Sequence, residues 1–133
     1  MIFKLLSGSL LAASLAALGQ TPPPAYMETF RAVSEALANR DADAFLDQLD
    51  SRMPGIDKLR DEVRDLTATA QEIGSTIDVI TDEGNDQKRS FQLDWLLTID
   101  ESEPRRQVVK CEIEKQGKNW KITRLEPVEF FRK

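Results

Sequence analysis

The sequence contains no histidine and only one cysteine, Cys111, among its 133 residues. Histidine is the side chain whose charge changes near neutral pH and the commonest metal ligand, so its absence removes the usual carrier of acid–base catalysis. A single cysteine cannot form an internal disulfide, so the fold must depend on its hydrophobic core. Val109 and Ile113 flank Cys111 on one face of a predicted strand, which indicates a buried and unreactive thiol.

The chain also lacks a basic segment. Its 18 Lys and Arg residues are interleaved with 23 Asp and Glu residues, and the formal net charge is −5. Proteins that bind nucleic acid present a basic patch or stripe, so we expect no nucleic-acid partner. A chain of this length has room for one hydrophobic core and therefore for one domain.

No apolar run reaches the roughly 20 residues that a membrane-spanning helix needs. The longest apolar or small-residue run extends from Leu5 to Leu18 and follows the positive charge of Lys4, and Ala17 and Gly19 provide small residues at the −3 and −1 positions of a cleavage site before Gln20. This pattern is typical of a cleaved signal peptide. We predict a signal peptide over residues 1–19, a single domain over residues 20–133, and export to the periplasm or medium without stable membrane insertion after cleavage. An uncleaved N-terminal anchor is the alternative, and it also places the domain outside the cytosol.

Helical periodicity runs through the first half of the predicted domain. Apolar residues recur at spacings of three and four in two stretches, which lays them on one face of each helix. Asp41 is a suitable N-cap for a short helix between the two, and Met53-Pro54-Gly55 ends it. The periodicity predicts three helices: from the prolines at 22–24 to about residue 40, from 41 to about 52, and over 56–70.

After Gly74 the period of the apolar residues changes to two, which indicates β-strands. We predict four strands, over residues 75–82, 90–100, 107–115 and 119–126. The short connections between them are rich in turn-forming residues, so neighbouring strands are expected to form antiparallel hairpins. The predicted fold class is α+β, with three N-terminal helices packed on the apolar face of a four-stranded antiparallel sheet.

The order of these elements, together with segments Asp41 to Gly55 and Trp120 to Phe131, resembles the nuclear transport factor 2-like (SnoaL-like) superfamily, and more narrowly its small exported bacterial members. The resemblance implies a cone-shaped, cystatin-like roll with a curved sheet and a pocket between helices and sheet. Some members use this pocket for isomerisation or dehydration, and others use it only for binding. Few residues separate the second and third helices here, which leaves no room for a hairpin that many members have and implies a shallower pocket.

No catalytic residue is predicted, because the inner sheet positions carry no carboxylate, histidine or tyrosine. Asp94 and Glu112 alternate to the opposite face, where a charged side chain stays hydrated. The acidic cluster at 82–86 does not have the spacing of a calcium-binding loop and is interpreted as a solvated turn. We predict neither a metal nor a cofactor.

Four aromatic residues could line the pocket and contact a small apolar ligand: Tyr26, Phe30, Trp95 and Trp120. The alternative interpretation is that these side chains are ordinary core residues. The function predicted is an exported binding or interaction module that is not catalytic. The alternative is a small-molecule isomerase or dehydratase with Tyr26 as its proton donor.

Three aliphatic residues are expected on the outer face of the sheet: Ile80, Leu96 and Val108. They form a candidate interface for a weak homodimer or for docking of another protein, because members of the resembling superfamily often form dimers through that surface. The alternative is an ordinary surface, since scattered apolar residues are normal on monomers.

Overall fold

A computed structural model describes residues 23–133, so the predicted signal peptide lies outside the described residues. The helices are α2 (Met27–Ala38), α3 (Ala42–Leu46) and α4 (Ile56–Thr69). The side chain of Asp41 accepts a hydrogen bond of 3.0 Å from the Ala44 N–H and caps α3, as predicted. Gly55 precedes α4 with φ +77°, a left-handed conformation that glycine adopts without strain. No helix in residues 23–133 has the length and apolar character required to cross a membrane.

The strands are β1 (Ile73–Gly84), β2 (Lys88–Ile99), β3 (Arg105–Gln116) and β4 (Asn119–Glu126). They form one antiparallel sheet in the order β1-β2-β3-β4. The predicted α+β class is confirmed. The structure extends the first three strands beyond most of their predicted ends, because backbone pairing continues where the alternation of side chains has faded.

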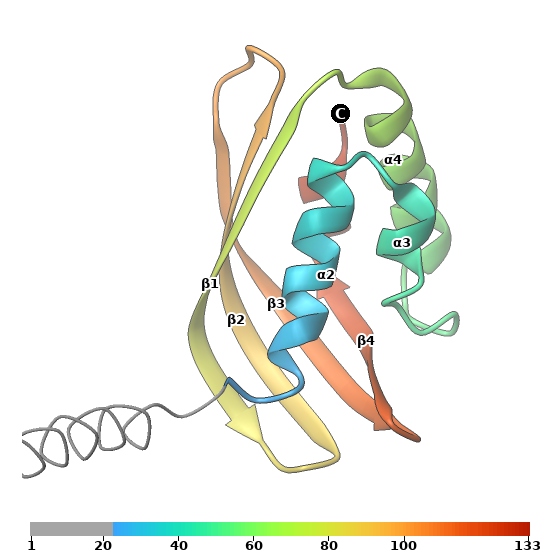
Figure 1. Ribbon diagram of the computed structural model, residues 1–133, viewed down its shortest axis with the longest axis vertical. Helices are drawn as coiled ribbons and strands as arrows, with labels where there is room; N and C mark the ends of the chain where they lie inside the picture. Colours follow the sequence, from blue (N-terminus) through green and yellow to red (C-terminus); the bar gives the residue numbers. More distant parts are fainter. Residues whose placement is uncertain (1–22) are drawn as a thin grey trace, which may run out of the picture.

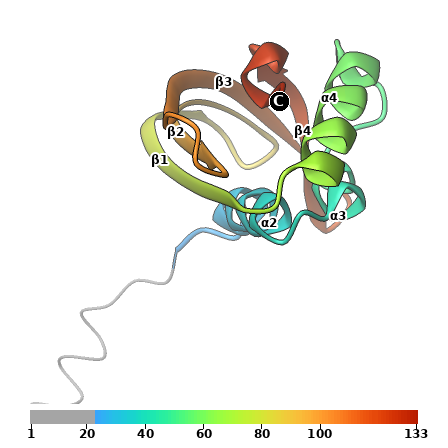
Figure 2. The ribbon, with the colours of Figure 1, turned by 90° about the horizontal axis from the view of Figure 1, so that it is seen from above.

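The sheet is curved, and the three helices lie on its concave side (Figure 1). Seen from above, β1, β2 and β3 curve around one side of the interior, while α2, α3 and α4 close the other (Figure 2). The arrangement is the predicted cone. Its inner strand positions are buried, as the alternation in β2 and β3 indicates.

A short 3₁₀ helix, η1 (Val128–Phe131), follows β4 and was not predicted. It lies between β3 and α4 (Figure 2). Phe130 and Phe131 are 2% and 0% exposed. The ring of Phe131 is 5.0 Å from that of Trp95 and 5.6 Å from that of Phe45. The C-terminal segment therefore joins the core between helices and sheet.

The segment after α3 pairs with the outer edge of β4 at a single bridge. Leu49 forms a parallel bridge with Ile122, in which the Asp50 N–H donates to the Ile122 carbonyl and the Ile122 N–H to the Gln48 carbonyl, each over 2.8 Å. The predicted second helix was therefore too long, because these backbone groups pair with β4 instead of continuing α3.

Asp50 holds this connection in place. It is 9% exposed and accepts hydrogen bonds from the backbone and side chain of Arg52 and from Gln116 Nε2, the last over 2.6 Å. These donors, with the Arg52 guanidinium as the largest contributor, hold the pKa of Asp50 well below its usual range. A charged carboxylate thus ties the α3–α4 connection to the end of β3.

Candidate functional site

A β-bulge in β1 changes which side chains face the interior of the cone. Val79 lies opposite Leu93 and Thr81 opposite Gln92, so Ile80 has no partner in β2. Beyond this extra residue the alternation is reversed, and Asp82 lies opposite the buried Phe91. The interpretation of residue 82 as part of a solvated turn was wrong, because the bulge turns its side chain inward.

Asp82 belongs to a polar cluster at the mouth of the cone, the end where α2 begins and the β1–β2 hairpin turns. The Tyr26 hydroxyl donates to Asp82 Oδ2 over 2.8 Å, and Arg89 Nε donates to Asp82 Oδ1 over 2.7 Å. The guanidinium carbon of Arg89 lies 5.0 Å from the centre of the Tyr26 ring, within the range of a cation–π contact. Arg89 faces inward because it lies opposite Ile113. The expectation that ionisable groups are absent from the inner face was therefore wrong.

The electrostatics of this cluster are those of a structural clamp. The side chains of Arg89 and Asp82 are 18% and 26% exposed, and they neutralise each other. The hydrogen bond to Asp82 raises the pKa of Tyr26, so the phenol retains its proton and donates it to a carboxylate of the same chain. The cluster ties the start of α2 to the β1–β2 hairpin. Sequence reasoning missed it because the residues around the bulge are mostly polar and show no break in pattern.

Three of the four pocket candidates come together beside this clamp. The Tyr26 ring lies 5.6 Å from that of Phe91 and 5.7 Å from that of Trp120, and the Phe30 ring lies 4.8 Å from that of Phe91. Phe30 and Phe91 are buried, whereas Tyr26 and Trp120 are half-buried. The four rings form an aromatic cluster next to the clamp.

Trp95 lies apart from this cluster. Its side chain has no exposed surface and packs on Phe130 and Phe131, with ring distances of 6.1 and 5.0 Å. Its indole N–H donates to Ser75 Oγ over 2.9 Å, so the one polar atom of the ring is also satisfied. The space beneath Trp95 is thus occupied by side chains from the C-terminal segment.

A groove with mainly apolar walls runs between α2 and β1. Its volume is about 380 Å³, and its walls include Met27 and Phe30 from the helix and Ile77 and Val79 from the strand. The pocket candidate Phe30 therefore contributes to this surface groove as well as to the core.

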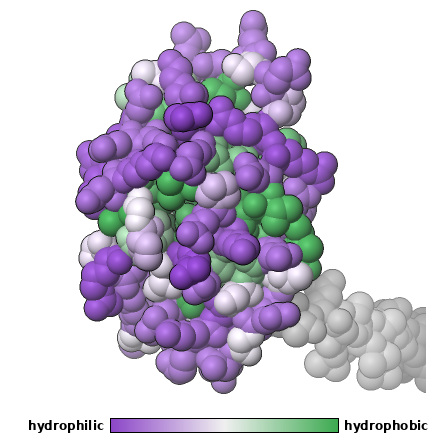
Figure 3. All heavy atoms as spheres, turned by 180° about the vertical axis from the view of Figure 1, so that it is seen from behind, coloured by the Kyte–Doolittle hydropathy of each residue, from purple (hydrophilic) through white to green (hydrophobic). Residues whose placement is uncertain are grey.

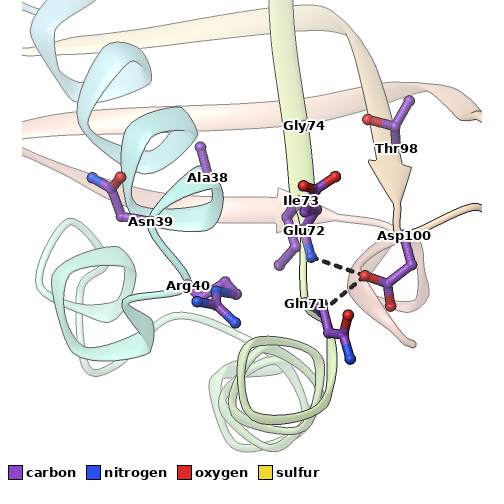
Figure 4. A pocket seen from close by; sticks show the side chains of 9 residues that line it. All are labelled: Ala38, Asn39, Arg40, Gln71, Glu72, Ile73, Gly74, Thr98 and Asp100. Carbon is purple, nitrogen blue, oxygen red and sulfur yellow. Dashed lines mark hydrogen bonds between the residues drawn. The ribbon is translucent and has the colours of Figure 1, made fainter.

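A larger hollow of about 550 Å³ lies where α2 ends and β1 begins (Figure 4). Asp100 Oδ1 accepts hydrogen bonds of 2.8 Å from the backbone N–H groups of Gln71 and Glu72, which lower the pKa of Asp100. Arg40 Nη1 donates to the Ala70 carbonyl over 3.2 Å. Two of the charged side chains that line this hollow are therefore engaged in holding the chain between α4 and β1.

The three interface candidates lie on the sheet with unequal exposure. Ile80 and Val108 are each 51% exposed, and Leu96 is half-buried opposite Arg106. Val79, which is 37% exposed and was not predicted, is not part of this face, because it lies opposite the buried Leu93 and lines the groove beside α2. Most of the surface in Figure 3 is hydrophilic, with hydrophobic patches between the polar residues.

Asp94 interrupts the candidate interface. It faces outward as predicted, opposite Val108, and Arg106 Nε donates to its Oδ1 over 2.9 Å.

Cys111 lies on the inner face of the sheet, where its side chain is 1% exposed, and burial raises the pKa of its thiol. The prediction of a buried cysteine is confirmed, and a buried thiol with a raised pKa is expected to react slowly.

No family model and no curated protein matches this chain, but solved structures do. The protein Bd1075 of Bdellovibrio bacteriovorus aligns over 75% of this chain with a TM-score of 0.66 and 15% identity. The alignment covers 37% of Bd1075, so this chain spans little more than a third of that protein's length.

Two further structures match over most of both chains. A proposed calcium/calmodulin-dependent protein kinase type II association domain from Thiobacillus denitrificans has a TM-score of 0.64 and 14% identity, over 80% of this chain and 95% of its own. A proposed dehydratase of the NTF2-like family from Streptomyces avermitilis has a TM-score of 0.61 and 11% identity, over 77% and 95%. The chain thus has the nuclear transport factor 2-like fold, also described as cystatin-like, and the resemblance in fold is confirmed. Proteins of this fold differ in function, and identities this low show the fold alone.

Proposed function

We propose that this chain is a non-catalytic interaction module that acts outside the cytosol. The observation that carries the proposal is the filled interior of the cone, where Phe130 and Phe131 pack on Trp95 and leave its ring no exposed surface. A catalytic pocket must admit a substrate to groups that exchange protons with it. Here the space beneath Trp95 is occupied by the aromatic side chains of the C-terminal segment.

The polar groups at the mouth support the same proposal. Tyr26, Asp82 and Arg89 are bonded to one another, so a substrate would have to break these contacts before any of the three could transfer a proton. The proposal is also supported by the Thiobacillus denitrificans protein, a proposed association domain that has the same fold. The leader-like residues 1–19 support a location outside the cytosol.

The outer sheet face remains a proposed site for weak self-association. Ile80 and Val108 are exposed, but the Asp94–Arg106 ion pair lies in the same face. A stable interface buries about 800 Å² per partner, so a dimer here would have to cover that ion pair as well. Sedimentation at rising concentration, repeated with Leu96→Asp, tests this: a strictly monomeric wild type excludes the dimer, and a dimer that survives the substitution uses another face.

The filled interior can be tested with small apolar ligands such as benzene and indole. We expect the Trp95 indole N–H resonance of the wild-type domain to remain unshifted, and the same resonance in Phe131→Ala to shift with saturation, because that substitution opens a cavity beside Trp95. Arg132→Ala, at the exposed neighbouring position, should behave as wild type. Saturable binding at Trp95 in the wild type would contradict the proposal, and Tyr26→Phe would then test the isomerase or dehydratase alternative.

A further inference from the structure

The two edge strands of the sheet, β1 and β4, differ in how their outer backbone groups are paired. The segment Gln48 to Asp50 pairs with β4 at Ile122, so that edge is partly covered. At β1, Ser34 Oγ donates to the Ser75 carbonyl over 2.9 Å, and no other strand within residues 23–133 pairs with this edge. An uncovered edge strand is a template for pairing with another extended chain. The edge of β1 beyond Ser75 is such a template.

The hydrogen bonds show which backbone N–H and C=O groups of β1 point away from β2 and are available to another strand. The Glu72 carbonyl accepts from the Asp100 N–H, so residue 72 is bonded toward β2, whereas the Ser75 carbonyl points to the outer edge. In an antiparallel pair these directions alternate from residue to residue. Ile77 and Val79 therefore direct their N–H and C=O groups outward, and the bulge at Ile80 ends the regular edge.

The same two residues line the groove between α2 and β1, together with Met27 and Phe30. Ile77 is half-buried and Val79 is 37% exposed, so the strand itself contributes uncovered apolar surface. A chain that pairs with the edge places every second side chain on the groove side. Apolar side chains at those positions would complete the core along this edge.

On the outer face the edge carries the acidic side chain of Asp78. Asp78 is exposed and lies opposite Asp94, and Arg106 is paired with Asp94. In the described part of the chain, Asp78 forms no ion pair of its own. Arg106 also attracts Asp78, but it is bonded to Asp94, so a positive side chain opposite Asp78 in an added strand would give Asp78 an ion-pair partner of its own.

This charge also argues against a second copy at the edge. Consider two copies whose β1 edges pair in an antiparallel way through Ile77 and Val79. Ile77 of each copy then lies opposite Val79 of the other, and the two Asp78 side chains lie directly opposite each other. Like charges in that position destabilise a strand pair. The edge is therefore suited to a partner of opposite charge.

We propose that an extended segment of a partner protein, with a basic residue between two apolar ones, adds to β1 as a further strand. Its apolar side chains lie in the groove between α2 and β1, and its basic side chain lies opposite Asp78. Strand addition of this kind derives affinity from main-chain hydrogen bonds and specificity from pockets for alternate side chains. The inference rests on the proposed function and names the chemistry of the partner.

The probe is a labelled nine-residue peptide with valine at alternate positions, one central lysine, and threonine elsewhere; its matched control carries glutamate instead of lysine. In fluorescence anisotropy we expect the lysine peptide to bind at least tenfold more tightly than the control, and Asp78→Lys to reverse that preference. Asp61→Lys makes the same change of charge at an exposed position of α4 and should leave the preference unchanged. Circular dichroism checks that each variant is folded.

Two measurements show whether binding is strand addition. Hydrogen exchange should slow at the Ile77 and Val79 amides when the lysine peptide is bound. N-methylation of one alternate set of peptide amides should abolish binding, while methylation of the other set should not, because only one edge of the peptide faces β1.

Absence of binding up to millimolar peptide, binding unaffected by Asp78→Lys, or equal effects of the two methylated sets would overturn the proposal. Self-association that protects the same amides would assign the edge to a second copy and would also overturn it. These results leave the measurement at Trp95 untouched, so failure of this inference is distinguishable from failure of the proposed function.

Discussion

Phe131→Ala removes the side chain that fills the cone from its C-terminal end. The ring is fully buried and lies within 5.0 to 5.6 Å of the rings of Trp95, Phe130 and Phe45. Phe→Ala in a core costs about 3–5 kcal/mol, and aromatic pairs add to the loss from buried area. Since the curved sheet and the helices limit collapse around the cavity, we expect a loss of about 4 kcal/mol, a large part of the 5–15 kcal/mol typical of a domain.

Urea unfolding followed by tryptophan fluorescence measures this loss, because Trp95 lies against the deleted ring. With a slope of about 2 kcal/mol per molar urea, the midpoint should fall by about 2 M while the slope stays unchanged. Arg132→Ala removes an exposed side chain next to it and should change the free energy of unfolding by less than about 0.5 kcal/mol. A loss below about 1 kcal/mol in Phe131→Ala would refute the docking of the C-terminal segment into the cone.

Asp82→Asn should destabilise the domain by about 1–2 kcal/mol in urea, because it leaves a mostly buried arginine without its counter-charge, whereas Glu83→Gln, on an exposed side chain, should be neutral. If both substitutions cost the same, the clamp has no energetic role. Asp50 has a depressed pKa in the fold, so its contribution is present above the unfolded pKa of about 3.9 and is lost as the pH falls below it toward the folded value. The stability difference between wild type and Asp50→Asn should therefore be largest near pH 7 and shrink below about pH 4; a difference independent of pH would contradict the assignment. N-terminal sequencing of protein recovered from the envelope or medium should begin at Gln20, and an intact Met1 in the cytosol would disprove export.

The order of elements and the inward faces of β2 and β3 could be predicted from the sequence. Both depend on local periodicity, because residues two apart share a face of a strand and residues three or four apart share a face of a helix. The burial of Cys111 and the outward direction of Asp94 follow from the same alternation. The positions of apolar residues along the chain are enough to define which residues form the core, whereas the detailed fit of their side chains adds only the last part of the stability.

The candidate site was decided by tertiary structure. A bulge depends on which backbone groups pair across two strands, and the polar stretch from Thr81 to Gly84 carries no pattern that a bulge could visibly interrupt. Asp82 therefore turns inward to Tyr26 because of how β1 pairs with β2, which the residues around Asp82 do not reveal. In the same way, two adjacent phenylalanines at 130 and 131 are evidently apolar, but the cavity that they fill is formed by segments distant in sequence, and only the folded chain brings those segments together.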